Sequence, residues 1–279
     1  MDIKLIAVDM DGTLLNGKNE IDQRTIDVLQ KMIDRGVYVV PATGRCPGVF
    51  PKDLFRLNGL AYAVAENGAL IWNMKTGEAM ERIGLPLHVV KEAVEMADRC
   101  RSCSEVFVNG QAYSDSRCRE WAENPGHDEN FVRYFRENHQ WVDQLSEQTE
   151  LLSQAEKVNL YFELEQDGTD AKAYFGQNPS LSALTSVGRN VEITMAEADK
   201  GRGLESLMEH LHISREQVVA FGDQENDLGM LKTAGIGVAM GNAVPAVKQA
   251  ADYETLSNDE DGVACFLEKI VLLRFNETV

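Results

Sequence analysis

The sequence has no long hydrophobic run. No segment approaches the roughly 18 uncharged apolar residues that a membrane-spanning helix requires. The N-terminal stretch MDIKLIAVD also lacks the basic leader and apolar centre of a secretion signal. We therefore expect a soluble, cytoplasmic protein that has no membrane partner.

Basic residues are scarce. The chain has 27 Lys and Arg residues against 45 Asp and Glu residues, which gives a net charge of -18. This charge repels the phosphates of nucleic acids and the anionic surface of membranes. It argues against a nucleic-acid partner and leaves small molecules and metal cations as the expected ligands.

Cysteine is also rare, and its positions do not suggest pairing. Five cysteines, an odd number, in a chain without a secretion signal predict reduced thiols rather than a disulfide framework. Cys100 and Cys103 form one CxxC pair, but no second pair lies nearby to complete a zinc site. The histidines have no metal-ligand spacing either, so we expect them on the surface or in the core.

What the sequence does have is a regular alternation of apolar runs and helix-period segments. The 279 residues are 44% hydrophobic, which is enough for a substantial core in one or two domains. The runs LIAVD, VYVVP and QVVAFGD favour buried strands, and residues 22–36 and 201–212 favour amphipathic helices between them. Strands and helices that alternate with short links predict an α/β fold with a doubly wound parallel sheet.

The pattern changes in the middle of the chain. Residues 86–194 combine amphipathic helices with strand-like segments such as EVFVNGQAYS and KVNLYFELE. This mixture predicts an inserted α+β domain, in which an antiparallel sheet has helices on one face. Residues 1–85 and 195–279 form the expected core domain.

Acidic and small polar residues stand where the expected core strands end. Asp9 and Asp11 follow the first strand, Thr43 and Gly44 follow the second, and Asp223 follows a later one. Because ligands of doubly wound sheets bind beyond the carboxyl ends of the strands, we expect these residues to meet there. Three carboxylates repel one another unless a cation holds them, and oxygen ligands favour Mg2+ over zinc.

These residue types suit phosphoryl transfer. With a divalent ion between carboxylates and a phosphate, one carboxylate can attack phosphorus while a second, two residues on, passes a proton. Thr43 and Gly44 offer a hydroxyl and a backbone amide to phosphoryl oxygens. Lys200, just ahead of a helix expected to start near Gly201, adds a fixed positive charge.

Four segments, in chain order DMDGT, ATGR, DKG and GDQENDLGML, resemble the four motifs of the haloacid dehalogenase superfamily. The tail LSNDEDGVACFLEK and the insertion between the second and third motifs resemble the Cof-type phosphatases of class IIB, whose α+β cap lies in that interval. The resemblance covers the chain. It implies a core domain of the haloacid dehalogenase type and a class IIB cap over residues 86–194.

The resemblance also implies a role for each matching residue. Asp9 is the nucleophile that forms an aspartyl-phosphate, and Asp11 is the general acid that later activates water. Asp9 and Asp223 bind Mg2+ through their side chains, and Asp11 binds it through its backbone carbonyl. The residues that contact the phosphoryl group are the backbone of Met10, Thr43, Gly44, Lys200 and Asn226, and Asp227 supports the metal site.

The implied function is a Mg2+-dependent phosphatase that hydrolyses small phosphomonoesters, such as sugar phosphates. Two alternatives remain: a phosphomutase of the same superfamily, and a non-catalytic phospho-receiver, which leaves the pairing of Asp11 with a large cap unexplained. The insertion is expected to act as a lid that sets substrate selectivity. Asn258 and Asp259 suit either a functional role or a loop that caps a helix. Neither the oligomeric state nor the individual phosphomonoester follows from the sequence.

Overall fold

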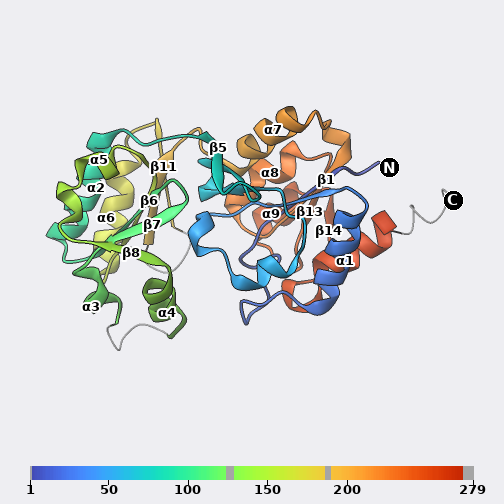
Figure 1. Ribbon diagram of the computed structural model, residues 1–279, viewed down its shortest axis with the longest axis horizontal. Helices are drawn as coiled ribbons and strands as arrows, with labels where there is room; N and C mark the ends of the chain where they lie inside the picture. The colour runs from blue at the N-terminus through green and yellow to red at the C-terminus, as the bar shows by residue number, and fades with distance from the viewer. Residues whose placement is uncertain (1, 124–128, 186–189, 273–279) are drawn as a thin grey trace. The chain divides into compact units, whose positions relative to one another are not determined.

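The computed structural model describes residues 2–123, 129–185 and 190–272, and Figure 1 traces the chain. The chain divides into two compact units. Unit 1 consists of Met1–Gly44, Phe50–Met80 and Asp199–Val279, and unit 2 consists of Arg45–Val49 and Glu81–Ala198. The sequence predicts an insertion at residues 86–194. The longer segment of unit 2, Glu81–Ala198, extends a few residues beyond each end of it.

The short segment Arg45–Val49 joins unit 2 for a physical reason. The amide of Gly48 donates a hydrogen bond to the carbonyl oxygen of Gly110 at 2.7 Å. Val49 is buried in a small apolar cluster with Phe107. The segment therefore packs as part of unit 2, although it directly follows the second motif.

Unit 1 is built on a parallel sheet in the order β14-β13-β12-β1-β2. Its central strands are unbroken apolar runs because both faces of the sheet are covered, and every residue of the first strand is buried. The strands are β1 (Leu5–Val8), β2 (Tyr38–Pro41), β12 (Val218–Gly222), β13 (Ile236–Ala239) and β14 (Tyr253–Glu254).

The helices of unit 1 pack an apolar stripe on the core. In α1 (Gln23–Asp34), Ile26, Leu29 and Met32 recur at the spacing of one helix face and are buried. Gly36 follows with a positive φ of 81°, which ends the helix where the sequence predicted. The other helices are α7 (Lys200–Leu211), α8 (Leu228–Thr233), α9 (Pro245–Ala250) and α10 (Gly262–Phe266). The predicted α/β class with a parallel core sheet is confirmed.

A second, three-stranded sheet follows the second motif in the order β3-β4-β5. Strand β3 (Tyr62–Ala65) is antiparallel to β4 (Leu70–Asn73), and β5 (Glu78–Arg82) lies at the edge. The turn between β3 and β4 holds Asn67 at a φ of 57°, a left-handed conformation in which Asn is enriched. The short helices and turns of unit 1 are η2 (Lys52–Arg56), η3 (Glu66–Gly68), η5 (Arg215–Gln217), η6 (Glu225–Asp227), η7 (Asn258–Glu260) and the π-helical turn η8 (Leu267–Leu272).

Unit 2 contains a six-stranded sheet in the order β10-β11-β9-β6-β7-β8. The sequence predicted an antiparallel sheet, which is wrong for β7 and β8, because these two strands are parallel. Parallel neighbours need a long crossover, and the helical segment between β7 and β8 provides it. The strands are β6 (Cys103–Val108), β7 (Gln111–Asp115), β8 (His139–Val142), β9 (Ala155–Tyr161), β10 (Leu181–Leu184) and β11 (Asn190–Met195).

Helices cover both faces of this sheet, whereas the sequence predicted helices on one face. Val106 of β6 packs in one apolar cluster with residues of α2 (Leu87–Arg99) and α6 (Glu165–Phe175). Cys103 of the same strand packs in another cluster with residues of α3 (Cys118–Ala122) and α4 (Glu129–Asn138). Successive side chains of a strand point to opposite faces, so odd and even positions of β6 meet different helices. Unit 2 is completed by α5 (Thr149–Leu152), η1 (Pro47–Val49) and η4 (Leu145–Glu147).

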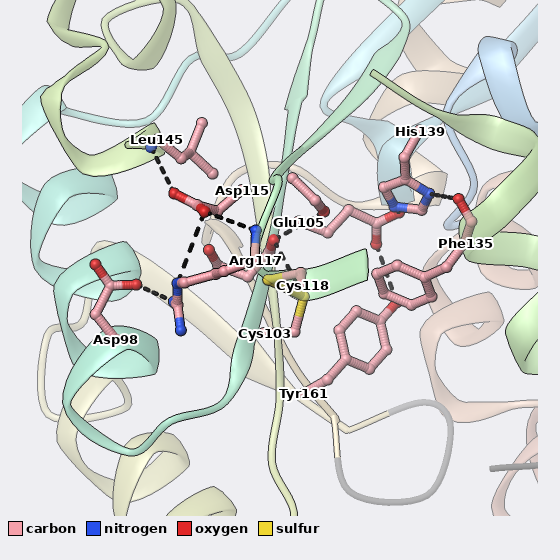
Figure 2. The surroundings of a disulfide bond; sticks show 12 residues. Asp98, Cys103, Glu105, Asp115, Arg117, Cys118, Phe135, His139, Leu145 and Tyr161 are labelled. Atoms are coloured by element: carbon pink, nitrogen blue, oxygen red, sulfur yellow. Dashed lines mark hydrogen bonds and ion pairs between the residues drawn. A yellow bond between two sulfur atoms is a disulfide. The ribbon is translucent and has the colours of Figure 1, made fainter. Parts of the chain in front are cut away.

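A disulfide joins β6 to the start of α3, as Figure 2 shows. Cys103 and Cys118 form it, with their Cα atoms 5.5 Å apart. The prediction of reduced thiols is therefore wrong for this pair, and it holds for Cys46, Cys100 and Cys265, which are not part of a disulfide. The partner of Cys103 is not its CxxC neighbour, because the fold brings residues 15 positions apart in the sequence together here.

A buried carboxylate lies near the disulfide (Figure 2). Glu105 accepts hydrogen bonds from the hydroxyl groups of Tyr134 and Tyr161, at 2.6 and 2.9 Å, and pairs with His139 at 2.7 Å. Burial alone would raise the pKa of Glu105, but His139 and the hydroxyl donors lower it below its usual value. His139 is thus a core histidine that anchors β8, and Tyr134 holds α4 to the sheet.

Within the described parts of the chain, no helix combines the length and the apolar character needed to cross a membrane.

Candidate active site

The first motif forms a turn directly after β1. The amide of Asp9 still donates to the carbonyl oxygen of Phe221 at 3.0 Å, which continues the sheet by one residue, and the Asp9 side chain is buried. The chain then folds back, so that Asp11 is exposed and forms an isolated bridge with Leu15. Gly12 has a φ of 83°, and a Cβ there would lie 2.5 Å from Oδ2 of Asp223. A glycine is therefore required for this turn to approach the fourth motif.

The third motif places Lys200 next to Asp9, the candidate nucleophile. Asp199 caps α7, because its side chain accepts hydrogen bonds from the amides of Gly201 and Arg202. Lys200, the first residue of this helix, is 1% exposed. Its Nζ lies 2.6 Å from Oδ1 of Asp9 and 2.7 Å from Oδ1 of Asp227. Lys200 thus links the first and fourth motifs.

The fourth motif is organised around Asp227. Its Oδ2 accepts hydrogen bonds from the amides of Asp223 and Gln224, at 2.9 and 3.0 Å, just past the end of β12. A Cβ on Gly222 would collide with the Asp227 side chain, so this approach also needs a glycine. Thr13 donates from its hydroxyl to Oδ1 of Asp223 at 2.9 Å. Asp227 therefore orients the segment that carries Asp223.

The second motif is linked to the fourth through Asn67, which the sequence predicts only as a turn residue. The amide of Thr43 donates to the carbonyl oxygen of Val64, and the carbonyl oxygen of Thr43 accepts from the amide of Asn67 at 3.0 Å. Oδ1 of Asn67 accepts a hydrogen bond from Nδ2 of Asn226 at 3.1 Å. A Cβ on Gly44 would lie 3.1 Å from the same Oδ1. The Asn-Gly pair at the tip of β3 was the one sequence signal for this link.

The electrostatics of the cluster favour a bound cation. Burial and the carboxylate of Asp227 raise the pKa of Asp9 well above its usual range, and Lys200 opposes this shift. The pKa of Asp223 is also raised, chiefly by burial. Burial alone would lower the pKa of Lys200, but Asp227 and Asp9 raise it, so the amine stays protonated. Three acidic side chains are thus buried around one ammonium group, and a bound cation would favour their ionised forms.

The carboxylates fit a divalent metal ion. Oxygen atoms of Asp9, Asp223 and Asp227 lie within 4.8 Å of one another, and all three side chains are buried. Both oxygens of Asp227 are already engaged, one by Lys200 and the other by backbone amides. The oxygens of Asp223 also accept hydrogen bonds, but from the neutral side chains of Thr13 and Gln224. Asp227, in contrast, is held by an ammonium group and two amides. The side chains of Asp9 and Asp223 are therefore the expected ligands, and an all-oxygen set suits Mg2+.

Of the residues singled out from the sequence, Asp9, Lys200, Asp223 and Asp227 form one cluster. Met10 is buried, and its carbonyl oxygen accepts from the amides of Leu14 and Leu15, so this residue turns the chain. Thr13 and Asn67 are site residues that the sequence analysis missed.

The match to known proteins agrees with this geometry. The family model for haloacid dehalogenase-like hydrolases matches residues 6–267, so the chain belongs to this family. The putative phosphatase YxeH of Bacillus subtilis (strain 168) is 31% identical over 294 residues, which cover 97% of this chain and 99% of YxeH. The 5-amino-6-(5-phospho-D-ribitylamino)uracil phosphatase YcsE of the same organism is 31% identical over 274 residues, covering 98% of this chain and 97% of YcsE.

A solved structure shows the same fold. The crystal structure of a haloacid dehalogenase-like hydrolase from Bacteroides thetaiotaomicron has a TM-score of 0.84 and 29% identity to this chain, covering 96% of this chain and 99% of that one. The predicted superfamily is confirmed, and so is the prediction of an enzyme that hydrolyses phosphate esters. The sugar phosphatase BT4131 of subclass IIB has the same fold, with a TM-score of 0.78 and 24% identity.

Proposed function

We propose that this enzyme hydrolyses small phosphomonoesters in a Mg2+-dependent reaction that passes through an aspartyl-phosphate on Asp9. The observation that carries the proposal is the buried contact of 2.6 Å between Nζ of Lys200 and Oδ1 of Asp9. It holds a carboxylate at the end of β1 beside a fixed positive charge. Asp11, two residues on, is exposed, and it is the acid that we assign to the leaving group.

In the first step an oxygen of Asp9 attacks phosphorus, and the bond from phosphorus to the ester oxygen breaks. Asp11 donates a proton to that departing oxygen, so an alcohol leaves. In the second step Asp11 takes a proton from water, whose oxygen attacks phosphorus. The bond between phosphorus and Asp9 then breaks, which releases inorganic phosphate and restores the carboxylate of Asp9 and the protonated carboxyl group of Asp11.

The phosphoryl oxygens need donors throughout this sequence. We assign this role to the backbone of Met10, the hydroxyl of Thr43, the amide of Gly44, the ammonium group of Lys200 and the side-chain amide of Asn226. The side chains of Asp9 and Asp223 and the backbone carbonyl of Asp11 would hold Mg2+, which would neutralise charge on the transferring group. Asp227 keeps Lys200 and Asp223 in place, as its hydrogen bonds support.

The proposed substrate class is a small phosphorylated metabolite, such as a sugar phosphate. The similar protein YcsE is named for a phosphorylated ribityl compound of this size. The net charge of -18 disfavours a polyanionic partner such as nucleic acid. We propose hydrolysis rather than a mutase reaction, because Asp11 provides a base for water, and a long-lived phosphoenzyme would contradict this choice.

The test is turnover of a panel of phosphomonoesters with Mg2+ by the wild-type enzyme and by Asp9→Asn. This change keeps the size of the side chain and removes the attacking charge, so we expect a loss of roughly three orders of magnitude or more, about 4 kcal/mol. Asp27→Asn, which alters an exposed carboxylate on α1, is the matched control and should leave turnover unchanged. Near-normal activity in Asp9→Asn would exclude the covalent route.

A further inference from the structure

The turn that carries Asp11 is held from outside by three side chains near the C-terminal end of unit 1. Asn242 donates from Nδ2 to the carbonyl oxygen of Gly12 at 2.8 Å. Asn258 donates from Nδ2 to the carbonyl oxygen of Leu15 at 2.8 Å. Below, these two residues and Asp259 are called the tether.

The third contact of the tether lies one step further along the turn. The amide of Gly17 donates to Oδ1 of Asp259 at 2.8 Å. A Cβ on Gly17 would lie 3.3 Å from the same oxygen, so a glycine gives the backbone room to approach. The three contacts thus bond backbone atoms of Gly12, Leu15 and Gly17, within and just after the turn that the bridge between Asp11 and Leu15 closes.

The tether is itself connected to the catalytic cluster. Oδ1 of Asn242 accepts from the amide of Asn258 at 3.1 Å, so two of its members support each other. Two residues after Asn242, the amide of Val244 donates to the carbonyl oxygen of Asp223 at 3.0 Å. The segment that bonds the turn of Asp11 therefore also bonds the segment of Asp223.

Capping does not explain Asn258 and Asp259. The short helix η7 is capped by Ser257, whose side chain and that of Glu260 form a capping box with the backbone. The side chains of Asn258 and Asp259 bond instead to backbone atoms more than 240 positions earlier in the chain. The sequence leaves open whether Asn258 and Asp259 have a functional role or cap a helix. Their side chains bond to the turn of the first motif and not to the start of η7, which argues against the capping role.

We propose that Asn242, Asn258 and Asp259 are positioning residues that hold Asp11 where its carboxyl group can donate a proton to the leaving oxygen. This inference rests on the role of Asp11 in the proposed function. A general acid must lie within hydrogen-bond reach of the oxygen that it protonates. Asp11 is exposed on a turn next to a glycine at positive φ, and the tether bonds the backbone of this turn at Gly12 and Leu15.

The test uses leaving groups that need a proton to different degrees. We expect Asn258→Ala and Asn242→Ala to lower kcat for an alkyl ester, a hexose 6-phosphate, by roughly ten- to a hundredfold, the size of effect that a misplacement of about 1 Å produces. The loss for p-nitrophenyl phosphate, whose leaving group departs without a proton, should stay below about threefold. KM should change by less than about twofold for both esters, because the phosphoryl contacts are intact.

The matched control is Ser257→Ala. It removes the cap of the same short helix, a hydrogen bond of 2.6 Å to Glu260, without touching the turn. Any loss in this variant should be equal for the two esters. Thermal unfolding of each variant shows whether it folds, and Asn242→Ala keeps the test available where Asn258→Ala does not fold.

Asp11→Asn separates this inference from the proposed function. A leaving-group-dependent loss in Asp11→Asn and in the tether variants supports both. The same loss in Asp11→Asn, with equal losses for the two esters in both tether variants, overturns the tether alone. Equal losses for the two esters in Asp11→Asn remove Asp11 as the acid and the tether with it.

Discussion

Asp9→Asn should stabilise the metal-free enzyme while it abolishes turnover. Asp9 is buried beside Asp227 and Asp223, and its pKa is raised well above the usual value of 3.8. The charged form of this carboxylate is therefore less favourable in the folded than in the unfolded chain. An asparagine has the same shape without the charge, and its Oδ1 can still accept a hydrogen bond from Lys200.

The sign and size of the effect follow from the raised pKa. A group whose pKa is raised in the folded state contributes its full stability below its unfolded value, here 3.8, and loses that contribution as the pH rises through the folded value. Each pH unit in this window costs the wild-type protein about 1.4 kcal/mol. The variant has no such titration at position 9. Its advantage should thus be absent near about pH 4 and grow toward neutral pH.

Thermal unfolding in a chelating buffer measures this advantage. At about 2–4 °C for each kcal/mol, the melting temperature of Asp9→Asn should exceed that of the wild type by several degrees at neutral pH. Added Mg2+ should raise the melting temperature of the wild type and close the gap, because the cation neutralises the charge that Asn lacks. Two results would refute this reasoning. One is a melting temperature of Asp9→Asn below that of the wild type in chelator at neutral pH, and the other is a difference in melting temperature that does not change with pH.

Three further results are expected. Chelation should abolish turnover and Mg2+ should restore it, whereas Ca2+ should substitute poorly because its larger oxygen shell can take both oxygens of Asp9; turnover by fully metal-free protein contradicts this. Labelling of the unreduced, denatured chain should find three free thiols, and Cys118→Ala should lower the free energy of unfolding by about 3 kcal/mol; five labelled thiols contradict the disulfide. Exchange of 81–198 together with 45–49 for the equivalent unit of a relative should change the ranking of phosphomonoesters while the need for Asp9 persists, and an unchanged ranking contradicts a selective role for unit 2.

The sequence predicted the parts of the site that follow from strand ends. A buried parallel strand cannot hold charge, so Asp9 and Asp223 had to stand where β1 and β12 leave the sheet. The sequence predicts a helix from about Gly201 with Lys200 just ahead of it, and α7 begins one residue earlier, at Lys200. That Lys200 contacts Asp9 depends on how α7 packs, which no local pattern encodes.

The features that were missed in unit 2 depend on distant packing in the same way. Cys103 and Cys118 lie on a strand and a helix, and their pairing requires that α3 lies on the face of β6 opposite to α2. The sequence showed alternating residues on β6, but not that a second pair of helices covers its other face. The segment with α3 and α4 is also the crossover that makes β7 and β8 parallel. Hydrophobic alternation along a strand does not show whether its neighbour is parallel or antiparallel.

The tether illustrates the limit most clearly. The segment SNDEDG has the composition of a helix cap, and Ser257 and Glu260 do form one. Asn258 and Asp259, between them, use their side chains on the turn of the first motif, a relation that a local reading of composition cannot reveal. A cap needs one polar side chain at the start of a helix. This segment has two further polar side chains, Asn258 and Asp259, whose hydrogen-bond partners lie in the turn of the first motif. Polar side chains in excess of what the local structure can use therefore indicate a long-range contact, and here that contact leads to the turn of the proposed proton donor.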